Sequence, residues 1–370
     1  MDAQLEGKRA EGRDDLLLLC VILTVWFGSS DLLLRLLDDI IPHTPARQRS
    51  RQLATIAINP SAPNQPKMDP YPRPFVIQPK TTHKQSVILL HGRGGCAAEF
   101  GPALLFHPIN NKSSTTFLSS TLKSLFPSAK FIFPTAPRRT AATYNYSLIN
   151  QWFDYWPLAT TLSGEDCTAT SSPVTDKLHI AINGLAETAG FLHDLIRDEA
   201  ALVGCQNVVL GGLSQGGAAS IVAGLLWDDR KEGPLGGIFG LCSWLPFAGK
   251  MKDLSVSALK DEASGYGDAP AARAIEHLQN ELQLPSTSSA STNRYPYSSS
   301  SLLAESTPFF LGHGLEDEKI PVQFGREAAA CLRAMGLPVV WKEYAALNHW
   351  YSETMLRDLA EFLMGILDEA

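Results

Sequence analysis

The sequence lacks the signatures of several large functional classes. It has no G-x-x-x-x-G-K-[ST] phosphate loop and no H-E-x-x-H zinc motif. Its six cysteines are scattered without a C-x-x-C pair, which indicates reduced thiols and excludes a disulfide framework or a cysteine zinc site. The net charge is −7, so the chain also lacks the basic excess that a nucleic-acid-binding surface needs. Nothing in the sequence requires a metal or a cofactor.

Long apolar runs are missing as well. The run Leu16–Phe27 falls short of the about 20 apolar residues that span a bilayer, and the flank before it lacks the net positive charge of a signal peptide. A second leucine-rich run extends to Ile41. Three alternatives remain for residues 16–41: a weak membrane anchor, an amphipathic helix on a surface, or sequence outside the working protein. Residues 42–67 have the composition of a linker.

We therefore divide the chain into an extension, residues 1–67, and one domain, residues 68–370. Met68 is a second candidate start of the working protein. We expect a cytoplasmic protein, with membrane tethering through the N-terminal segment as the alternative.

Apolar patterns alternate between two periods along the domain. Short runs typical of buried strands are followed by stretches with helical spacing of three and four. The strand runs are Ser86–Leu90, Lys130–Phe133, Val208–Gly211, Gly236–Leu241, Pro308–Leu311 and Pro338–Glu343. The helical stretches include Leu178–Glu199, Phe324–Leu332 and Met355–Leu367. This alternation predicts an α/β fold, in which helices cover both faces of a mostly parallel sheet.

The stretch Asn207–Ala219 has the pattern of a nucleophile elbow. A short apolar strand leads into Gly212–Gly216, which matches G-x-S-x-G, and small and apolar residues follow as in a helix. At such a strand-to-helix turn the flanking glycines prevent clashes and the hydroxyl of Ser214 is presented outwards. The N–H of Gln215, at the helix N-terminus, is free to bind an oxyanion. The alternative is a glycine-rich turn that happens to contain a serine.

A serine nucleophile needs a base and a carboxylate that orients the base. Of the nine histidines, His349 alone is expected on a loop after the last strand. Asp317 follows the preceding strand, and its neighbour Glu316 is the alternative acid. The chain order serine, acid, histidine is that of the α/β-hydrolases. We predict that Ser214, Asp317 and His349 form a catalytic triad that acts through an acyl-enzyme.

The loop after the first core strand, His91–Gly95, predicts a second oxyanion donor, by position the backbone N–H of Arg93. A glycine turn without a catalytic role is the alternative. His91 itself, like His313, precedes a glycine at a strand end and is interpreted as a turn-packing residue. Trp152 and Trp244 are candidates for substrate contact, although large aromatics such as Trp152 are more often core residues.

Residues 248–306 interrupt the strand–helix alternation. They contain a serine-rich part, residues 286–301, and a single helical pattern, Arg273–Leu282. We expect an insertion that is partly disordered, either a solvated loop or a lid over the active site.

Several stretches together resemble one known family. They are VILLHGRGG, FIFPTAP, NQWFDYW, VVLGGLSQGGAAS, LCSWLP, PFFLGHGLEDEKIPV and the loop from Tyr344 to His349. In this order and spacing they resemble the acyl-protein thioesterases, in the phospholipase/carboxylesterase group of α/β-hydrolases. The resemblance covers most of residues 86–247 and 307–370. It implies the triad and the two oxyanion donors named above.

The resemblance also implies an activity. Members of this family hydrolyse long-chain acyl thioesters on protein cysteines, and also lysophospholipids and simple esters, mainly in the cytosol. The chain departs from the family pattern at Arg93, where leucine is usual, at Ala346, where glycine is usual, and in its extension and insertion. We expect a thioester or ester hydrolase acting on an acylated protein or a small acyl ester. The alternatives are a small-molecule carboxylesterase or lysophospholipase without a protein substrate, and a non-catalytic receptor or scaffold.

Overall fold

The computed structural model describes residues 71–109, 120–157, 178–180, 182–262, 270–284 and 307–367. The extension 1–67, and with it the three alternatives for residues 16–41, lies outside the described residues. Within those residues, no helix has both the length and the apolar character to cross a bilayer.

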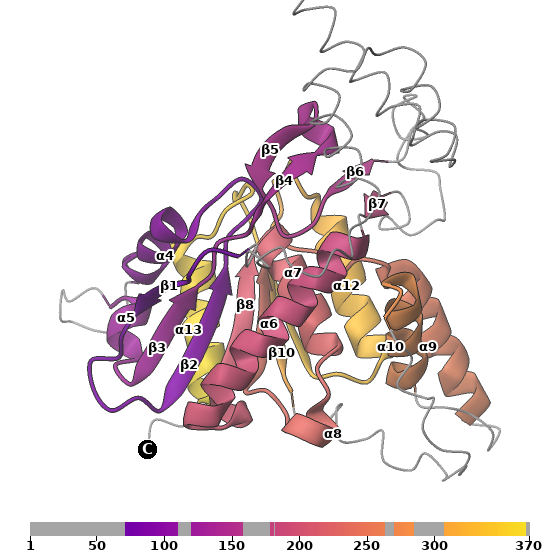
Figure 1. The fold of residues 1–370 in the computed structure, drawn as a ribbon. Coiled ribbons are helices and arrows are strands. Elements are labelled where there is room, and N and C mark those ends of the chain that lie inside the picture. The colour runs from indigo at the N-terminus through magenta and orange to yellow at the C-terminus, as the bar shows by residue number, and fades with distance from the viewer. Residues whose placement is uncertain are drawn as a thin grey trace, which may run out of the picture. The chain divides into compact units, whose positions relative to one another are not determined.

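A seven-stranded sheet in the order β1-β3-β2-β8-β9-β10-β11 forms the centre of the described domain (Figure 1). Its strands are β1 (Phe75–Ile77), β2 (Gln85–Leu90), β3 (Ala129–Phe133), β8 (Val208–Leu213), β9 (Gly237–Leu241), β10 (Phe309–Gly314) and β11 (Val339–Tyr344). The edge strand β1 runs antiparallel to β3, whereas all other neighbours in this sheet are parallel. The six strands read from the sequence all occur, with ends shifted by up to three residues.

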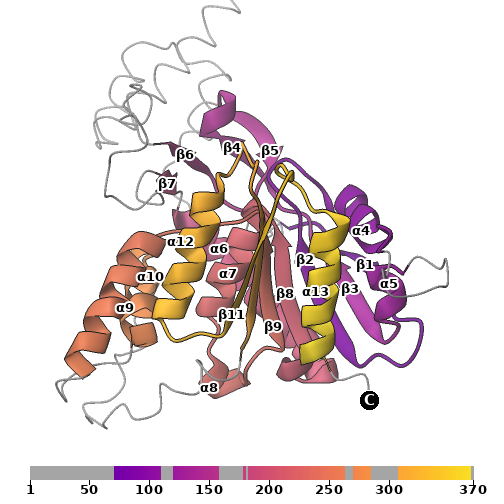
Figure 2. The ribbon, with the colours of Figure 1, turned by 180° about the vertical axis from the view of Figure 1, so that it is seen from behind.

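Helices cover both faces of the sheet, as Figures 1 and 2 show. One face carries α6 (Ile182–Val203), α7 (Gln215–Leu225) and α12 (Val322–Ala334), and the other carries α4 (Ala97–Leu105), α5 (Leu122–Leu125) and α13 (Glu353–Ile366). Because side chains alternate along a strand, β2 supplies both cores. Ile88 and Leu90 join the cluster under α6 and α7, while Val87 and Leu89 join the one under α13. The predicted fold class is therefore confirmed.

Two antiparallel pairs of strands lie beyond the central sheet. The hairpin of β4 (Arg138–Ala141) and β5 (Ser147–Asn150) carries a short 3₁₀ turn, η1 (Ala142–Tyr144). β6 (Tyr155–Pro157) pairs with β7 (Leu178–Ile180). The strand runs found in the sequence do not include the β4–β5 hairpin, because cross-strand pairing rather than apolar alternation forms it. The predicted helix 178–199 also begins too early, since its first three residues form β7.

The region after β9 contains more regular structure than its sequence predicts. α9 (Ala248–Glu262) and α10 (Pro270–Glu281) lie beside α12 in Figure 2. Met251 of α9 and Ala271, Ala274 and Leu278 of α10 are buried in the core cluster of that face. The helical pattern at Arg273–Leu282 is confirmed as α10, whereas α9 was not predicted. A solvated loop is the wrong description of both segments, because their small apolar faces pack onto the domain. The serine-rich residues 286–301 lie outside the described residues. Two further short elements are η4 (Cys205–Asn207) and α8 (Asp229–Glu232).

Candidate active site

Ser214 occupies a sharp turn between β8 and α7. Its backbone has φ 56° and ψ −124°, a conformation that L-residues rarely adopt and that signals strain. The flanking glycines explain how the turn fits. A Cβ on Gly212 would lie 2.6 Å from the carbonyl oxygen of Leu90, and one on Gly216 would lie 2.5 Å from that of His91. The strand, the turn and the helix therefore meet too closely for any side chain at these two positions.

The structure brings the three predicted triad side chains into one hydrogen-bonded row. His349, on the loop after β11, lies with Nε2 2.8 Å from Oγ of Ser214 and Nδ1 2.7 Å from Oδ2 of Asp317. Since a carboxylate only accepts, Nδ1 carries the proton and Nε2 offers its lone pair to the serine hydroxyl. The row has the polarity that a general base needs before it removes the serine proton.

Asp317 is buried and stays charged. Its Oδ1 accepts the backbone N–H groups of Lys319 at 3.0 Å and Ile320 at 2.8 Å. Burial alone raises the pKa of Asp317, but hydrogen bonds from His313, His349 and Ile320 outweigh it and hold that pKa below its ordinary value. The alternative acid, Glu316, is exposed to solvent.

Two side chains around Asp317 were not singled out from the sequence as part of this site. His313, interpreted as a turn-packing residue, is fully buried with Nε2 3.2 Å from Oδ2 of Asp317 and 2.8 Å from the carbonyl oxygen of Ile320. The sequence signal that could have placed His313 in the site is its position four residues before Asp317. Sγ of Cys242, which follows β9, lies within 4.8 Å of a carboxylate oxygen of Asp317 and of a ring nitrogen of His349. Burial raises the pKa of the Cys242 thiol to about 12, so the thiol is a neutral neighbour at neutral pH.

The loop His91–Gly95 lies directly beside the serine. A Cβ on Gly92 would meet Cβ of Ser214 at 3.4 Å and its Oγ at 4.0 Å. Gln215 opens α7, so its N–H is among the first-turn donors without an intrahelical acceptor. The backbones of both predicted donors, Arg93 and Gln215, are thus adjacent to Ser214 in the chain or in space.

The side chain of Arg93 is held against β6. Its Nη2 donates to the carbonyl oxygen of Tyr155 at 2.8 Å, and its guanidinium carbon lies 3.5 Å from the centroid of the Tyr155 ring. Asp154 lies 3.8 Å from the same nitrogen. A cation at the usual leucine position is therefore accommodated by stacking and by a partial ion pair.

Trp152 and Trp244, the predicted substrate contacts, are both fully buried. The indole of Trp152 donates to the carbonyl oxygen of His91 at 2.8 Å, which matches the core alternative weighed for it. Trp244 packs its ring 4.9 Å from that of Tyr155, and its Nε1 has no hydrogen-bond partner among the described residues. Neither ring offers surface to a substrate in this conformation.

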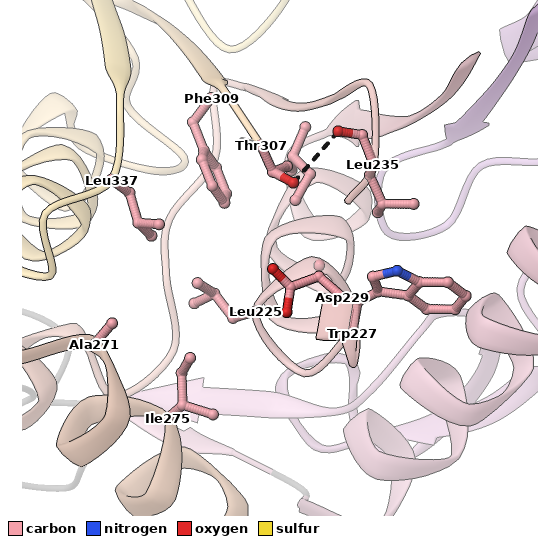
Figure 3. Close-up of a pocket in the computed structure, with 11 residues that line it drawn as sticks. Leu225, Trp227, Asp229, Leu235, Ala271, Ile275, Thr307, Phe309 and Leu337 are labelled. Atoms are coloured by element: carbon pink, nitrogen blue, oxygen red, sulfur yellow. Dashed lines mark hydrogen bonds between the residues drawn. The ribbon is translucent and has the colours of Figure 1, made fainter. Parts of the chain in front are cut away.

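A recess lies at the other end of α7 from Ser214 (Figure 3). Most of its wall is apolar and includes Leu225, Trp227, Leu235, Ile275, Phe309 and Leu337. Thr307 spans part of it with a hydrogen bond of 3.3 Å to the carbonyl oxygen of Leu235, drawn dashed in Figure 3. Among the described residues that line it there is no serine or histidine, so this wall differs from the site around Ser214.

The mostly parallel sheet with helices on both faces, and a serine on a strand-to-helix turn, define the class of the α/β-hydrolases. The sequence model of one family within this class, described as phospholipase/carboxylesterase, matches residues 71–264 and 286–367. The chain belongs to this family and is by class an ester or thioester hydrolase. The unmatched residues between the two parts include α10.

Curated relatives agree with this assignment. The chain is 25% identical to an acyl-protein thioesterase 1 of Emericella nidulans, over 80% of this chain and 95% of that protein. It is 24% identical to the carboxylesterase SOBER1 of Arabidopsis thaliana, over 75% of this chain and 88% of that one. The fold also matches the crystal structure of acyl-protein thioesterase 2 from Zea mays, with a TM-score of 0.52 and 22% identity over 80% of this chain and all of that one.

Proposed function

We propose that this protein cleaves thioesters or carboxylic esters of acyl groups, with Ser214 as nucleophile, His349 as general base and acid, and Asp317 as the orienting carboxylate. The observation that carries the proposal is the unbroken row from Asp317 through His349 to Ser214, with distances of 2.7 and 2.8 Å. These residues come from three loops far apart in the sequence. Their order supports a catalytic triad, in which the carboxylate orients the histidine and the histidine accepts the serine proton.

The proposed reaction has two halves. His349 Nε2 takes the proton of Ser214 as Oγ attacks the acyl carbon, and the buried charge of Asp317 stabilises the imidazolium that forms. The backbone N–H groups of Gln215 and Arg93 face the oxyanion of the tetrahedral intermediate. His349 then protonates the leaving thiolate or alkoxide. Water, activated by the same histidine, releases the acid and restores Ser214.

For the substrate we propose an acyl group on a protein cysteine, of the palmitoyl-protein type. The support is the similarity to acyl-protein thioesterases over most of the chain. We further propose a cytoplasmic location, which fits the free thiols of Cys96, Cys205, Cys242 and Cys331. Membrane association through residues 16–41 is an alternative that the described residues do not address.

The second candidate is a small-molecule carboxylesterase or lysophospholipase without a protein substrate. Arg93 favours it, because a cationic side chain in the loop beside the serine replaces the apolar one that is usual in the thioesterases. The similarity to a plant carboxylesterase supports the same alternative. A non-catalytic receptor or scaffold is the third candidate, and the complete row of hydrogen-bonded side chains argues against it.

The proposal is tested by fluorophosphonate labelling of the wild type, Ser214→Ala and His349→Ala, followed by hydrolysis of short- and long-chain thioesters. We expect labelling of the wild type only. Ser220→Ala is a matched control, since this buried serine of α7 donates to the carbonyl oxygen of Gly216 within its own helix, and its loss should leave labelling intact. Turnover of short chains alone would favour the carboxylesterase. A folded wild type that is not labelled would contradict the catalytic proposal.

A further inference from the structure

Trp152 connects the two sides of the proposed oxyanion hole. Its indole N–H donates to the carbonyl oxygen of His91 at 2.8 Å, at the start of the loop that contains Arg93. Its backbone N–H donates to Oε1 of Gln215 at 3.0 Å, at the start of α7. The side chain of Trp152 is fully buried, so these bonds have no competition from solvent.

Both the oxygen and the nitrogen of the Gln215 side-chain amide form hydrogen bonds. Besides accepting from Trp152, it donates through Nε2 to the carbonyl oxygen of Phe153 at 2.5 Å. These two bonds fix the orientation of the amide, since one partner is an N–H group and the other a carbonyl. Gln215 is fully buried, and its backbone N–H is the first of α7. The segment Trp152–Phe153 therefore fixes the residue that carries one proposed donor.

His91 sets the direction of the other donor. Its Nδ1–H donates to the carbonyl oxygen of Gly92 at 2.7 Å, and its Nε2 accepts the N–H of Ala136 at 3.0 Å. Burial lowers the pKa of His91 to about 4, so the ring is neutral and keeps this single tautomer. In a trans peptide the N–H of Arg93 points opposite to the carbonyl of Gly92. The imidazole holds that carbonyl together with the N–H of Gly95 at 3.1 Å, and this directs the N–H of Arg93 away from it.

We propose that His91, Trp152 and the side chain of Gln215 act as positioning residues, forming a buried hydrogen-bonded brace that sets the N–H groups of Arg93 and Gln215 relative to each other. This inference rests on the proposed function and adds residues that touch no reacting atom. It also gives Trp152 a role other than the substrate contact predicted from the sequence.

The brace acts on the tetrahedral intermediate rather than on the bound substrate. A misplaced donor weakens contact with a developing oxyanion, whereas the ground-state carbonyl depends on it less. Loss of the brace should therefore lower kcat and leave KM nearly unchanged. A purely structural role would lower stability without this separation of kcat from KM.

The test compares Trp152→Phe with Trp227→Phe. Each change removes one indole N–H bond to a backbone carbonyl, the second being the 2.9 Å bond of Trp227, a wall residue of the recess in Figure 3, to the carbonyl oxygen of Gly233. The readouts are kcat and KM for a short-chain ester, the affinity for a trifluoromethyl ketone that forms a tetrahedral adduct, and thermal unfolding. Removing a whole oxyanion donor costs about 10²–10³ in kcat, so we expect a loss of about 10–100-fold in Trp152→Phe. Trp227→Phe should keep its kcat.

A second pair of variants keeps the test decisive if Trp152→Phe does not fold. His91→Asn retains a donor near the position of Nδ1, whereas His91→Leu retains none. We expect kcat and affinity for the ketone to fall in His91→Leu and to be largely restored in His91→Asn. Wild-type kcat in a folded Trp152→Phe or His91→Leu variant would overturn the brace and leave the proposed function intact. A wild type that hydrolyses no ester and forms no ketone adduct would overturn both.

Discussion

The proposed triad and the proposed oxyanion donors are held in place in different ways. Ser214, His349 and Asp317 contact one another directly, through side chains whose chemistry is the reason for their presence. The proposed donors are backbone N–H groups, and the side chains of the brace form their hydrogen bonds to backbone atoms. Changes in the triad should therefore abolish the reaction, whereas changes around the donors should reduce it in graded steps.

The largest effect is expected from removing the nucleophile or the base. Ser214→Ala or His349→Ala should lower kcat by about 10⁵–10⁶, because the members of a triad act as one unit. The double variant should be hardly worse than either single one. Steady-state hydrolysis of a chromogenic ester measures kcat of the single and double variants. A loss of kcat in the double variant equal to the product of the two single losses would contradict a coupled triad.

Asp317→Asn should cost about 10⁴ in kcat, since an amide can impose the wrong tautomer on His349. The matched control is Glu316→Gln, which changes the adjacent exposed acid in the same way and should keep wild-type kcat. Comparing the two variants on one ester at pH 7 decides which acid acts. A larger loss in Glu316→Gln would refute the assignment.

The brace has its own pH dependence, which enters through His91. Its pKa is about 4 in the folded protein, against an ordinary value near 6.5, so the unfolded chain binds the extra proton first as pH falls. The contribution of neutral His91 to the free energy of unfolding is fully present above pH 6.5 and is lost as the pH falls from 6.5 to 4. At 1.36 kcal/mol per pKa unit the loss is about 3 kcal/mol. Urea unfolding of wild type and His91→Asn across this range measures it, and parallel curves would refute it.

The smallest effect is expected at Arg93, whose backbone is part of the proposed hole but whose side chain stacks on Tyr155. Arg93→Leu should cost about 1–2 kcal/mol of stability, because a desolvated cation–π contact is lost. The new apolar surface should raise the ratio of long- to short-chain turnover a few-fold. Arg138→Leu, on the exposed side of β4, is the control. An unchanged ratio in Arg93→Leu would remove Arg93 as the reason to favour the carboxylesterase.

The contrast between the side chains of the proposed triad and the backbone donors also explains what the sequence could predict. Six of the seven sheet strands were found because their buried runs are apolar, whereas the three-residue edge strand β1 was not found. Ser214, Asp317 and His349 were selected because few residue types can do their chemistry. The hairpin β4–β5 was missed because its residues are mixed in polarity and its pairing is set by distant contacts. The contacts of His91 and Trp152 were missed because a bond to a backbone carbonyl imposes no partner residue type. α9 was missed because its mean hydropathy is low and its buried face is formed mainly by small residues.

All residues of α7, from Gln215 to Leu225, are buried. A helix enclosed in this way has no frayed end through which water can reach its amides. Its amide protons should exchange with solvent only when the surrounding core opens cooperatively, so β8, the serine turn and α7 form one unit on the exchange timescale. The geometry at Ser214 is then as durable as the folded domain itself.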